Sequence, residues 1–343
     1  TKHMFTLGQN LSKDFKVFYA IPKNQNFEKI LNPENHIEIA ERKLNIFDII
    51  NLINFVNSKS IDIIHSHGKG AGLIGRILIL FKRRPLIYTF HGIHLRCHNK
   101  FQKVIYIFYE FLLGRLDSEK ILVSNSEKVY AQKSNIFLGN KYKIIHNGVR
   151  NLPKKSFQKL YKKNNKYLRS SNIKIISLCR FVRQKNINEI LKIAKRLPKM
   201  DFYIIGNGPL WDEIKYNIKN QNIFNVYLLG EKKDILRYLY YADIYLSTSL
   251  YEGLPLSILE AMSIGLPVLA SNVIGNCDTI VNGKSRFLYE IHNVNEAVNI
   301  LNKLSKNKYL REEVGDLARL RQREFFSKKI MISNYKELYK SKF

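Results

Sequence analysis

Two cations stand where a buried strand ends in the second half of the sequence. Arg180 directly follows the apolar run 173–178 and its cysteine, and Lys185 comes one loop later, before a helical pattern that begins at Ile187. Positive side chains at the carboxyl end of a strand suit a diphosphate, because arginine donates as a bidentate fork and lysine acts as a point charge. In so basic a chain, each cation also has a plain alternative role as a solvated surface charge.

Two glutamates flank the start of a predicted helix. Glu252 precedes this helix and Glu260 lies within it, with seven residues between them. Pro255 suits the first helical position because proline needs no partner for an N–H, and the amides of Leu256 and Ser257 then point outward and can bind an anion. A carboxylate beside such a site needs hydrogen-bond donors or a cation, and sugar hydroxyls are suitable donors. The alternative is that both glutamates are ordinary surface charges of a helix.

Three glycines match the spacing of a dinucleotide-binding loop. Gly70, Gly72 and Gly75 follow the predicted strand 61–66 and open a predicted helix. That loop also needs an acidic residue after the next strand to hold the ribose hydroxyls, and the run 86–91 has none at its end. We therefore interpret the glycines as small residues that allow a helix to pack closely on a sheet.

One short segment carries residue types that could bind a metal. It contains His91, His94, Cys97 and His98. Their spacing does not fit the usual patterns of structural zinc sites, and the sequence has no second cysteine pair to complete one. We therefore expect no metal at this segment.

Apolar runs alternate with helix-period segments along the chain, which is typical of strands covered by helices. In the first half, the predicted strands are 15–21, 61–66, 86–91, 120–125 and 143–146, and the predicted helices are 46–57, 70–81, 101–113 and 127–134. In the second half, the predicted strands are 173–178, 201–205, 225–229, 244–247, 267–270 and 286–289, and the predicted helices are 187–196, 210–220, 235–241, 255–264 and 294–304. This order predicts an α/β protein with parallel sheets.

The alternation breaks once, near the middle of the chain. Residues 151–174 carry many basic side chains and no acidic one, and we interpret them as a basic linker. The prediction is therefore an N-terminal domain over 1–150 and a C-terminal domain over 175–327, both doubly wound and Rossmann-like. In such domains a ligand binds at the carboxyl ends of the strands.

The composition is that of a folded protein with an unusual charge. Of its 343 residues, 45% are hydrophobic and 25% are charged, which excludes disorder, collagen and coiled coil as the main state. The net charge of +29 attracts anions such as phosphorylated ligands, nucleic acid or anionic lipid. The three cysteines are far apart, and we find no signal-peptide core and no apolar stretch of about 18–20 residues. We expect a cytoplasmic protein whose membrane contact is peripheral.

Several motifs together resemble the retaining glycosyltransferases of family 4, which have the two-domain GT-B fold. They are a Glu-x7-Glu pair, an Arg-x4-Lys pair, a Gly-x-Gly-Pro turn, an Asn-Gly-Val strand end, a His-x-His strand end and a Thr-Phe-His-Gly run. The matching residues are Glu252 and Glu260, Arg180 and Lys185, Gly206 and Gly208, 147–149, His65 and His67, and 89–92. The resemblance covers nearly the whole chain.

The resemblance implies a nucleotide-sugar donor, with a UDP-sugar favoured over a GDP-sugar. The donor-binding residues that it implies are Arg180, Lys185, Gly206, Gly208, Glu252, Gly253, Leu254, Pro255, Leu256 and Glu260. It assigns Glu260 to the ribose hydroxyls, Glu252 to the hydroxyls of the donor sugar, and His91 to the sugar or phosphate near the reacting carbon. His91 and Glu252 are thus the expected catalytic residues. Because no Asp-x-Asp pair is present, we expect the reaction to need no metal and no cofactor.

The resemblance also carries expectations about the fold. The two domains are expected to face each other across a cleft, with His67 toward the cleft and His65 packed in its strand. The segment 328–343 is expected to return as a helix onto the first domain. Family members open with a strand and a Gly-rich loop, whereas this sequence opens with residues that look like the helix after that loop. We therefore expect the N-terminal domain without its first strand.

The expected function is transfer of a hexose, with retention of configuration, to a growing, lipid-linked surface glycan such as capsule, exopolysaccharide or lipopolysaccharide. The expected partners are the nucleotide sugar, a lipid-linked or oligosaccharide acceptor and an anionic membrane surface at the inner face of the plasma membrane, and no nucleic acid. The alternatives are a GT-B-fold epimerase or phosphorylase, and a non-catalytic anion-binding protein. The apolar segment 101–113 has two interpretations, a core helix or an interfacial helix that the basic run 82–84 helps to hold at a membrane.

Overall fold

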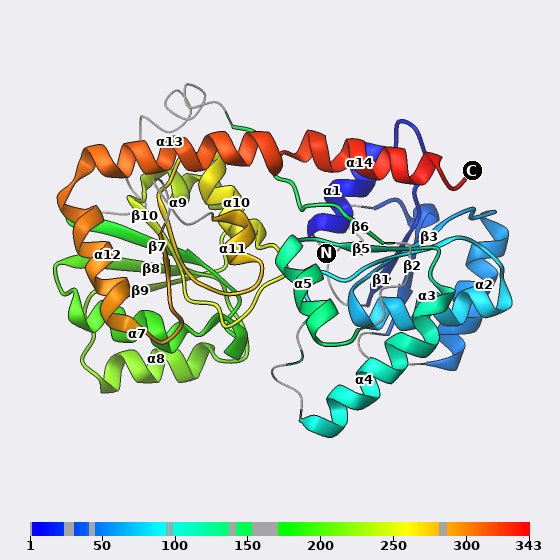
Figure 1. The fold of residues 1–343 in the computed structure, drawn as a ribbon, viewed down its shortest axis with the longest axis horizontal. Helices are drawn as coiled ribbons and strands as arrows, with labels where there is room; N and C mark the ends of the chain where they lie inside the picture. Colours follow the sequence, from blue (N-terminus) through cyan, green and yellow to red (C-terminus); the bar gives the residue numbers. More distant parts are fainter. Residues whose placement is uncertain are drawn as a thin grey trace. The chain divides into compact units, whose positions relative to one another are not determined.

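The computed structural model describes residues 2–23, 31–40, 45–93, 95, 99–136, 142–152, 171–280 and 287–343. The chain divides into two compact units, which Figure 1 draws with their elements labelled. The first unit comprises Thr1–Ile145 and Met331–Phe343, and the second comprises His146–Ile330.

The first unit contains two parallel sheets in its described residues. The larger has the strand order β3-β4-β5-β6, and the smaller pairs β1 with β2. The strands are β1 (Tyr19–Pro22), β2 (His36–Ile39), β3 (Ile64–His67), β4 (Leu86–Thr89), β5 (Glu119–Leu122) and β6 (Tyr142–Ile144). The helices are α1 (Lys2–Leu11), α2 (Ile46–Ser58), α3 (Gly68–Phe81), α4 (Lys100–Leu113), α5 (Asn125–Lys133) and α14 (Lys328–Lys340), with short 3-10 turns at Pro33–Asn35 and Gly114–Leu116.

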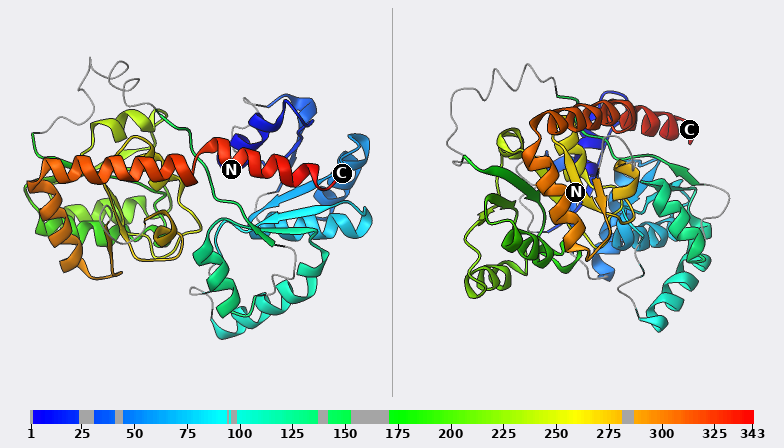
Figure 2. Two further views of the ribbon diagram at one scale, coloured as in Figure 1. Left: turned by 45° about the horizontal axis from the view of Figure 1, so that its top comes forward. Right: turned by 60° about the vertical axis from the view of Figure 1, so that its left-hand side comes forward.

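Helices cover both faces of the larger sheet of the first unit. Helices α1 and α14 lie on one face, where Leu7 and Tyr335 join a buried cluster with Ile87 and Ile121 of the sheet (Figure 1 and Figure 2). Helices α4 and α5 lie on the other face, with Tyr88 at the centre of a second cluster. Burial of these side chains, each contributing about 1.5–3 kcal/mol when fully removed from water, holds the layers together.

The second unit contains one six-stranded parallel sheet with the order β12-β11-β10-β7-β8-β9. Its strands are β7 (Ile173–Leu178), β8 (Met200–Ile205), β9 (Val226–Gly230), β10 (Ile244–Ser247), β11 (Val268–Ser271) and β12 (Phe287–Tyr289). Its helices are α7 (Ile187–Arg196), α8 (Trp211–Asn220), α9 (Ile235–Tyr241), α10 (Leu256–Ser263), α11 (Asn276–Thr279), α12 (Val294–Lys306) and α13 (Lys308–Phe325), with a 3-10 turn, η4, at Arg183–Lys185.

The strand order of the second unit defines where a ligand can bind. The chain runs outward from β7 through β8 to β9, and then returns to the other side of β7 to form β10. Helices α7, α8 and α12 cover one face of the sheet, and α9, α10 and α13 cover the other (Figure 1). The direction of winding therefore reverses between β7 and β10, and a crevice forms at the carboxyl ends of strands at such a reversal.

The expected α/β class with parallel sheets is confirmed. The boundaries of β7, α7, α9 and β10 coincide with the predicted ranges. Strand β2 was not predicted, and the predicted strand 15–21 is in fact Tyr19–Pro22.

Candidate functional site

The contact between Lys185 and Glu252 is the centre of the site in the second unit. The ammonium of Lys185 lies 2.5 Å from Oε1 of Glu252, which also accepts a hydrogen bond of 2.7 Å from the hydroxyl of Ser249. Glu252 is only 7% exposed, so this carboxylate is held by its cation and hydroxyl rather than by water. The two charges come from opposite sides of the winding reversal, since Lys185 follows β7 and Glu252 follows β10.

The backbone around Lys185 is fixed by the loop after β10. The hydroxyl of Thr248 donates to the carbonyls of Lys185 and Asn186, at 2.9 and 3.0 Å. The amide of Leu250 donates to the carbonyl of Gln184, and the Gln184 side chain donates to the carbonyl of Tyr251, both at 2.8 Å. These bonds join the turn η4 to the loop after β10, so the backbone position of Lys185 is determined by the fold.

Gly206 and Gly208 determine where Arg180 lies. Both glycines have positive φ, 137° and 158°, and a Cβ on Gly206 would lie 1.9 Å from the carbonyl oxygen of Cys179. On Gly208 a Cβ would lie 2.7 Å from the carbonyl oxygen of Phe181. Only glycine allows the turn after β8 to approach the loop after β7 so closely. Arg180, at the centre of that loop, is exposed at the carboxyl edge of the sheet.

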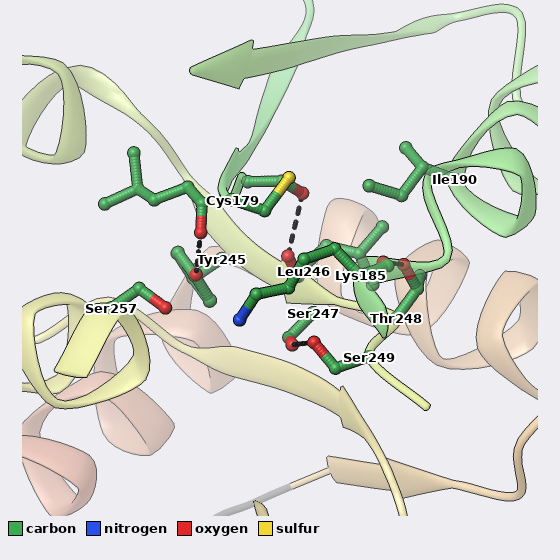
Figure 3. A pocket seen from close by; sticks show the side chains of 11 residues that line it. Cys179, Lys185, Ile190, Tyr245, Leu246, Ser247, Thr248, Ser249 and Ser257 are labelled. Carbon is green, nitrogen blue, oxygen red and sulfur yellow. Dashed lines mark hydrogen bonds between the residues drawn. The ribbon is translucent and has the colours of Figure 1, made fainter. Parts of the chain in front are cut away.

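Helix α10 begins beside the same edge. Pro255 is its N-cap rather than its first residue, one position from the prediction, and no side chain caps the helix there. The proline side chain offers no acceptor to the amides of the first turn, which carry the positive end of the helix dipole. The hydroxyl of Ser257 and the ammonium of Lys185 point toward one hollow, which is also lined by Cys179, Tyr245, Ser247 and Ser249 (Figure 3).

The remaining predicted donor-site residues lie around this helix start. Gly253 and Leu254 are buried before the helix, and the carbonyl of Leu254 accepts a hydrogen bond of 2.7 Å from the side chain of Asn147. Leu256 and Glu260 are half-exposed on α10. The structure thus brings Lys185 and Glu252 into direct contact and places Arg180 and Glu260 on neighbouring elements of the same unit.

The carboxyl edge of the first unit's larger sheet carries a group of histidines. His67 ends β3, and its Nδ1 lies 3.0 Å from Nε2 of His91, which follows β4. The ring of His3, from α1, is 4.7 Å from that of His91. His65 is bonded through its two nitrogens to the hydroxyls of Tyr339 and Thr89, so it is packed in its strand as expected.

The surroundings of His65, His67 and His91 disfavour their protonated forms. Burial lowers the pKa of His65 to about 3, with the proximity of His3 as the second cause. Burial, followed by the neighbouring histidines, also lowers the pKa values of His67 and His91 well below the usual range. A neutral His91 can accept a hydrogen bond from a hydroxyl, and its φ of 58° shows a backbone held in an uncommon conformation.

Two residues that position these groups were not among the predicted site residues. Glu127, fully buried, accepts hydrogen bonds from the amide of Gly92 at 2.6 Å and from the amide of Val123 at 2.8 Å, and so fixes the loop that carries His91. Ser249 orients Glu252. The polar run that follows the buried strand β10 was the available signal for Ser249, whereas Glu127 looked like an ordinary first-turn charge of a helix.

The glycines with dinucleotide-loop spacing and the segment with metal-binding residue types both belong to the first unit. A Cβ on Gly72 would lie 2.6 Å from the ring of Tyr88, and one on Gly75 would lie 2.2 Å from the hydroxyl of Ser66. The interpretation as close-packing residues is confirmed for Gly72 and Gly75, whereas a Cβ on Gly70 would meet nothing within 4 Å. His94, Cys97 and His98 lie outside the described residues.

Comparisons with known proteins agree with this architecture. Residues 2–150 match the family model Glycosyltransferase Family 4, and residues 159–321 match Glycosyl transferases group 1. The chain is 30% identical over 280 residues to the UDP-Gal:alpha-D-GlcNAc-diphosphoundecaprenol alpha-1,3-galactosyltransferase of Escherichia coli, covering 76% of this chain and 71% of that protein. It is 26% identical to the capsular polysaccharide biosynthesis glycosyltransferase CapM of Staphylococcus aureus, over 95% of this chain and 90% of CapM.

Solved structures show the same fold. Anabaena HepE in complex with UDP-glucose superposes with a TM-score of 0.84 at 18% identity, covering 99% of this chain and 95% of HepE. A glycosyltransferase of Rickettsia africae superposes with a TM-score of 0.78 at 21% identity, covering 99% of this chain and 94% of that one. The chain belongs to the family 4 glycosyltransferases and has the GT-B fold.

Proposed function

We propose that the protein transfers a hexose from a UDP-sugar to a lipid-linked glycan in the synthesis of a surface polysaccharide. The observation that supports this best is the contact of Lys185 with Glu252 beside the open start of α10, at the winding reversal of the second unit. A diphosphate is bound by cations and backbone amides, which Lys185 and the start of α10 offer. A sugar is bound by a carboxylate that accepts hydrogen bonds from its hydroxyls, which Glu252 offers. The names of the Escherichia coli and Staphylococcus aureus relatives agree with such a donor and pathway.

In this proposal the charged residues stabilise the leaving nucleotide. The bond between the sugar's anomeric carbon and the phosphate oxygen breaks, and a bond to the acceptor oxygen forms on the same face, with retention. The acceptor proton passes to the leaving phosphate. Arg180, Lys185 and the start of α10 hold the developing charge of the diphosphate, so the transfer itself needs no metal. Glu252 and His91 contact the donor sugar, and Glu260 accepts from the ribose hydroxyls.

A thermal-shift panel of UDP, GDP, ADP and their sugars tests the donor site. We expect UDP compounds to raise the melting temperature most, by the equivalent of about 2.7 kcal/mol at 100 times Kd. Arg180→Ala plus Lys185→Ala should abolish the shift, whereas Arg183→Ala, which removes an exposed cation from the same loop, should leave it unchanged. The donor-site assignment would be wrong if the double variant bound UDP as tightly as the wild type, or if EDTA prevented binding.

The apolar segment 101–113 supports the membrane part of the proposal, because much of the apolar surface of helix α4 faces away from the protein core. Its one fully buried residue is Glu110, whose carboxylate lies 2.8 Å from the guanidinium of buried Arg76, which in turn contacts Asp117 at 2.6 Å. The exposed face is apolar, with Phe101 73% and Phe108 61% exposed. The remaining exposed apolar side chains of α4 are Val104, Ile105, Phe111 and Leu112.

This face suits the surface of an anionic bilayer. Within the described residues, no helix is both long and apolar enough to cross a membrane. Lys100 and Lys103 on α4 and Arg115 just beyond it supply the positive charges that anionic headgroups attract, while the aromatic side chains can enter the acyl boundary. We therefore propose peripheral binding through α4 at the inner face of the plasma membrane.

Flotation with vesicles tests the role of α4. We expect the wild type to float with phosphatidylglycerol vesicles and much less with phosphatidylcholine vesicles. Phe101→Ser plus Phe108→Ser should reduce the bound fraction about tenfold or more, because two exposed aromatic side chains no longer leave water on binding. Phe224→Ser removes a phenylalanine of the second unit that is 84% exposed, more than either of these two, and serves as the control. Equal flotation of the α4 variant and the wild type would contradict the proposal.

A further inference from the structure

Three imidazoles converge at one end of the larger sheet of the first unit. They belong to His3 on helix α1, His67 at the end of β3 and His91 after β4. One ring nitrogen from each lies within 4.8 Å of the others, and the pair from His67 and His91 is 3.0 Å apart. His3 is buried, whereas His67 and His91 are partly exposed, so the group can be reached from solvent.

These distances suit the coordination of a metal ion. Zinc binds imidazole nitrogens at about 2.0–2.1 Å in tetrahedral sites, so two ligating nitrogens on one ion are about 3.3 Å apart. The pair from His67 and His91 already has nearly that separation, and the distances to His3, up to 4.8 Å, shorten when its side chain turns toward the ion. We propose that His3, His67 and His91 form a three-histidine site for a divalent cation of the zinc type, with its fourth position open to water or another ligand.

The scaffold keeps two of the three ligands in place. His67 pairs in register with Thr89, two residues before His91, so the two histidines sit on adjoining strand ends. The buried carboxylate of Glu127 holds the amide of Gly92 at 2.6 Å and thereby fixes the His91 backbone. Preorganised ligands of this kind favour binding because little side-chain freedom remains to be lost.

The third ligand, His3, comes from helix α1 and not from the sheet. Leu7 and Leu11 of α1 are buried in the cluster that includes Tyr335 of α14, and His3 reaches the sheet edge from that helix. A bound ion would therefore join α1 to two strand ends of the sheet and stabilise the first unit. The proposed function places His91 beside the donor sugar. An ion bound to His91 should therefore also slow transfer, an expectation that rests on the proposed function.

Visible absorption of Co²⁺ tests the site without any activity measurement. Tetrahedral Co²⁺ absorbs much more strongly than aqueous Co²⁺, and we expect one equivalent to develop this spectrum in the full chain and Zn²⁺ to displace it. His3→Ala and His67→Ala should each lose the spectrum, whereas His36→Ala, on β2 of the same unit, should keep it. A wild type without the spectrum, or a His67→Ala variant that keeps it, would overturn the proposal.

Two further experiments identify the residues that bind the ion. A His94→Ala, Cys97→Ser and His98→Ala variant should retain the Co²⁺ spectrum, and its loss there would assign the ion to other ligands. Zinc-edge X-ray absorption of the wild type needs no variant and should show three imidazole ligands, and a sulfur ligand or fewer imidazoles would refute the site. Zn²⁺ binding without slower transfer would count against the role of His91 in transfer and not against the metal site.

Discussion

The ion pair of partly exposed Lys185 and buried Glu252 joins two residues that were expected to have separate functions. Sequence patterns pointed to each residue separately, as a phosphate cation and as an acceptor of sugar hydroxyls. Their contact joins residues 67 positions apart and depends on β10 returning beside β7. No local pattern carries that information, because strand order is a property of the whole sheet. The polar run after β10 was an available signal for Ser249, but its bond to Glu252 and the bond of Thr248 to the Lys185 carbonyl depend on strand order in the same way.

Glu252→Gln separates the two functions. The amide keeps the size of the side chain but removes the negative charge beside the phosphate site, so UDP affinity should stay equal or increase. A hydrogen bond to a charged acceptor contributes about 1.5–3 kcal/mol, so kcat should fall roughly 10- to 100-fold. Calorimetry with UDP and steady-state kinetics measure the two effects. Loss of UDP affinity with unchanged kcat would be the opposite of the expected result.

The histidine group predicts how stability depends on pH. Because the folded-state pKa values of His65, His67 and His91 are lowered, the unfolded chain binds more protons below its own histidine pKa, near about 6.5. Stability from this group is therefore fully present above about pH 6.5 and is lost as the pH falls toward the folded-state values, about 3 for His65. Urea unfolding in chelator-treated buffer should show this loss, and His67→Gln should show less of it. Identical pH profiles would be evidence against a neutral His67 in the fold.

At the scale of elements, the sequence was most informative where periodicity was strong. Helix α7 was predicted to the residue because six of its ten side chains are buried on one face. Strand β2 was missed because its four residues, His36–Ile39, are all half-buried and show no clear alternation. The apolar helix α4 left two interpretations open, because composition alone does not say which face packs inward. In the structure Glu110 contacts buried Arg76, and two other side chains of α4, Tyr106 and Ile107, pack against the core, while the interfacial role stays a prediction.

The glycine turn after β8 gives a prediction of its own. Gly206→Ala should destabilise the second unit, because left-handed backbone costs about 1–2 kcal/mol and the new methyl group would collide with the Cys179 carbonyl. Gly230→Ala has a similarly positive φ of 68° but open space around it, so it should show the backbone cost alone. Urea midpoints of the two variants measure the difference. Equal destabilisation would mean that the close approach to Cys179 is not important.

On the scale of the whole molecule, the alternation of strands and helices was sufficient to predict two α/β halves with parallel sheets. The strand order β12-β11-β10-β7-β8-β9 and the separation of β1 and β2 from the larger sheet of the first unit could not be predicted from that alternation. The alternation along the sequence shows which segments are strands and which are helices. The order of the strands in a sheet depends instead on long-range packing. The strand order places β7 beside β10 and so brings the loop of Arg180 and Lys185 next to the segment of Glu252.

We propose above all that this protein transfers a sugar from a UDP-sugar to an acceptor. The most direct test incubates the full chain with UDP-galactose or UDP-glucose, with and without a diphosphate-lipid-linked sugar, and measures UDP release and the product by NMR. We predict UDP release only with the acceptor, a product of retained configuration, and loss of both in Arg180→Ala plus Lys185→Ala. Conversion of the UDP-sugar to its epimer without acceptor, or no turnover with any donor that binds, would contradict the claim.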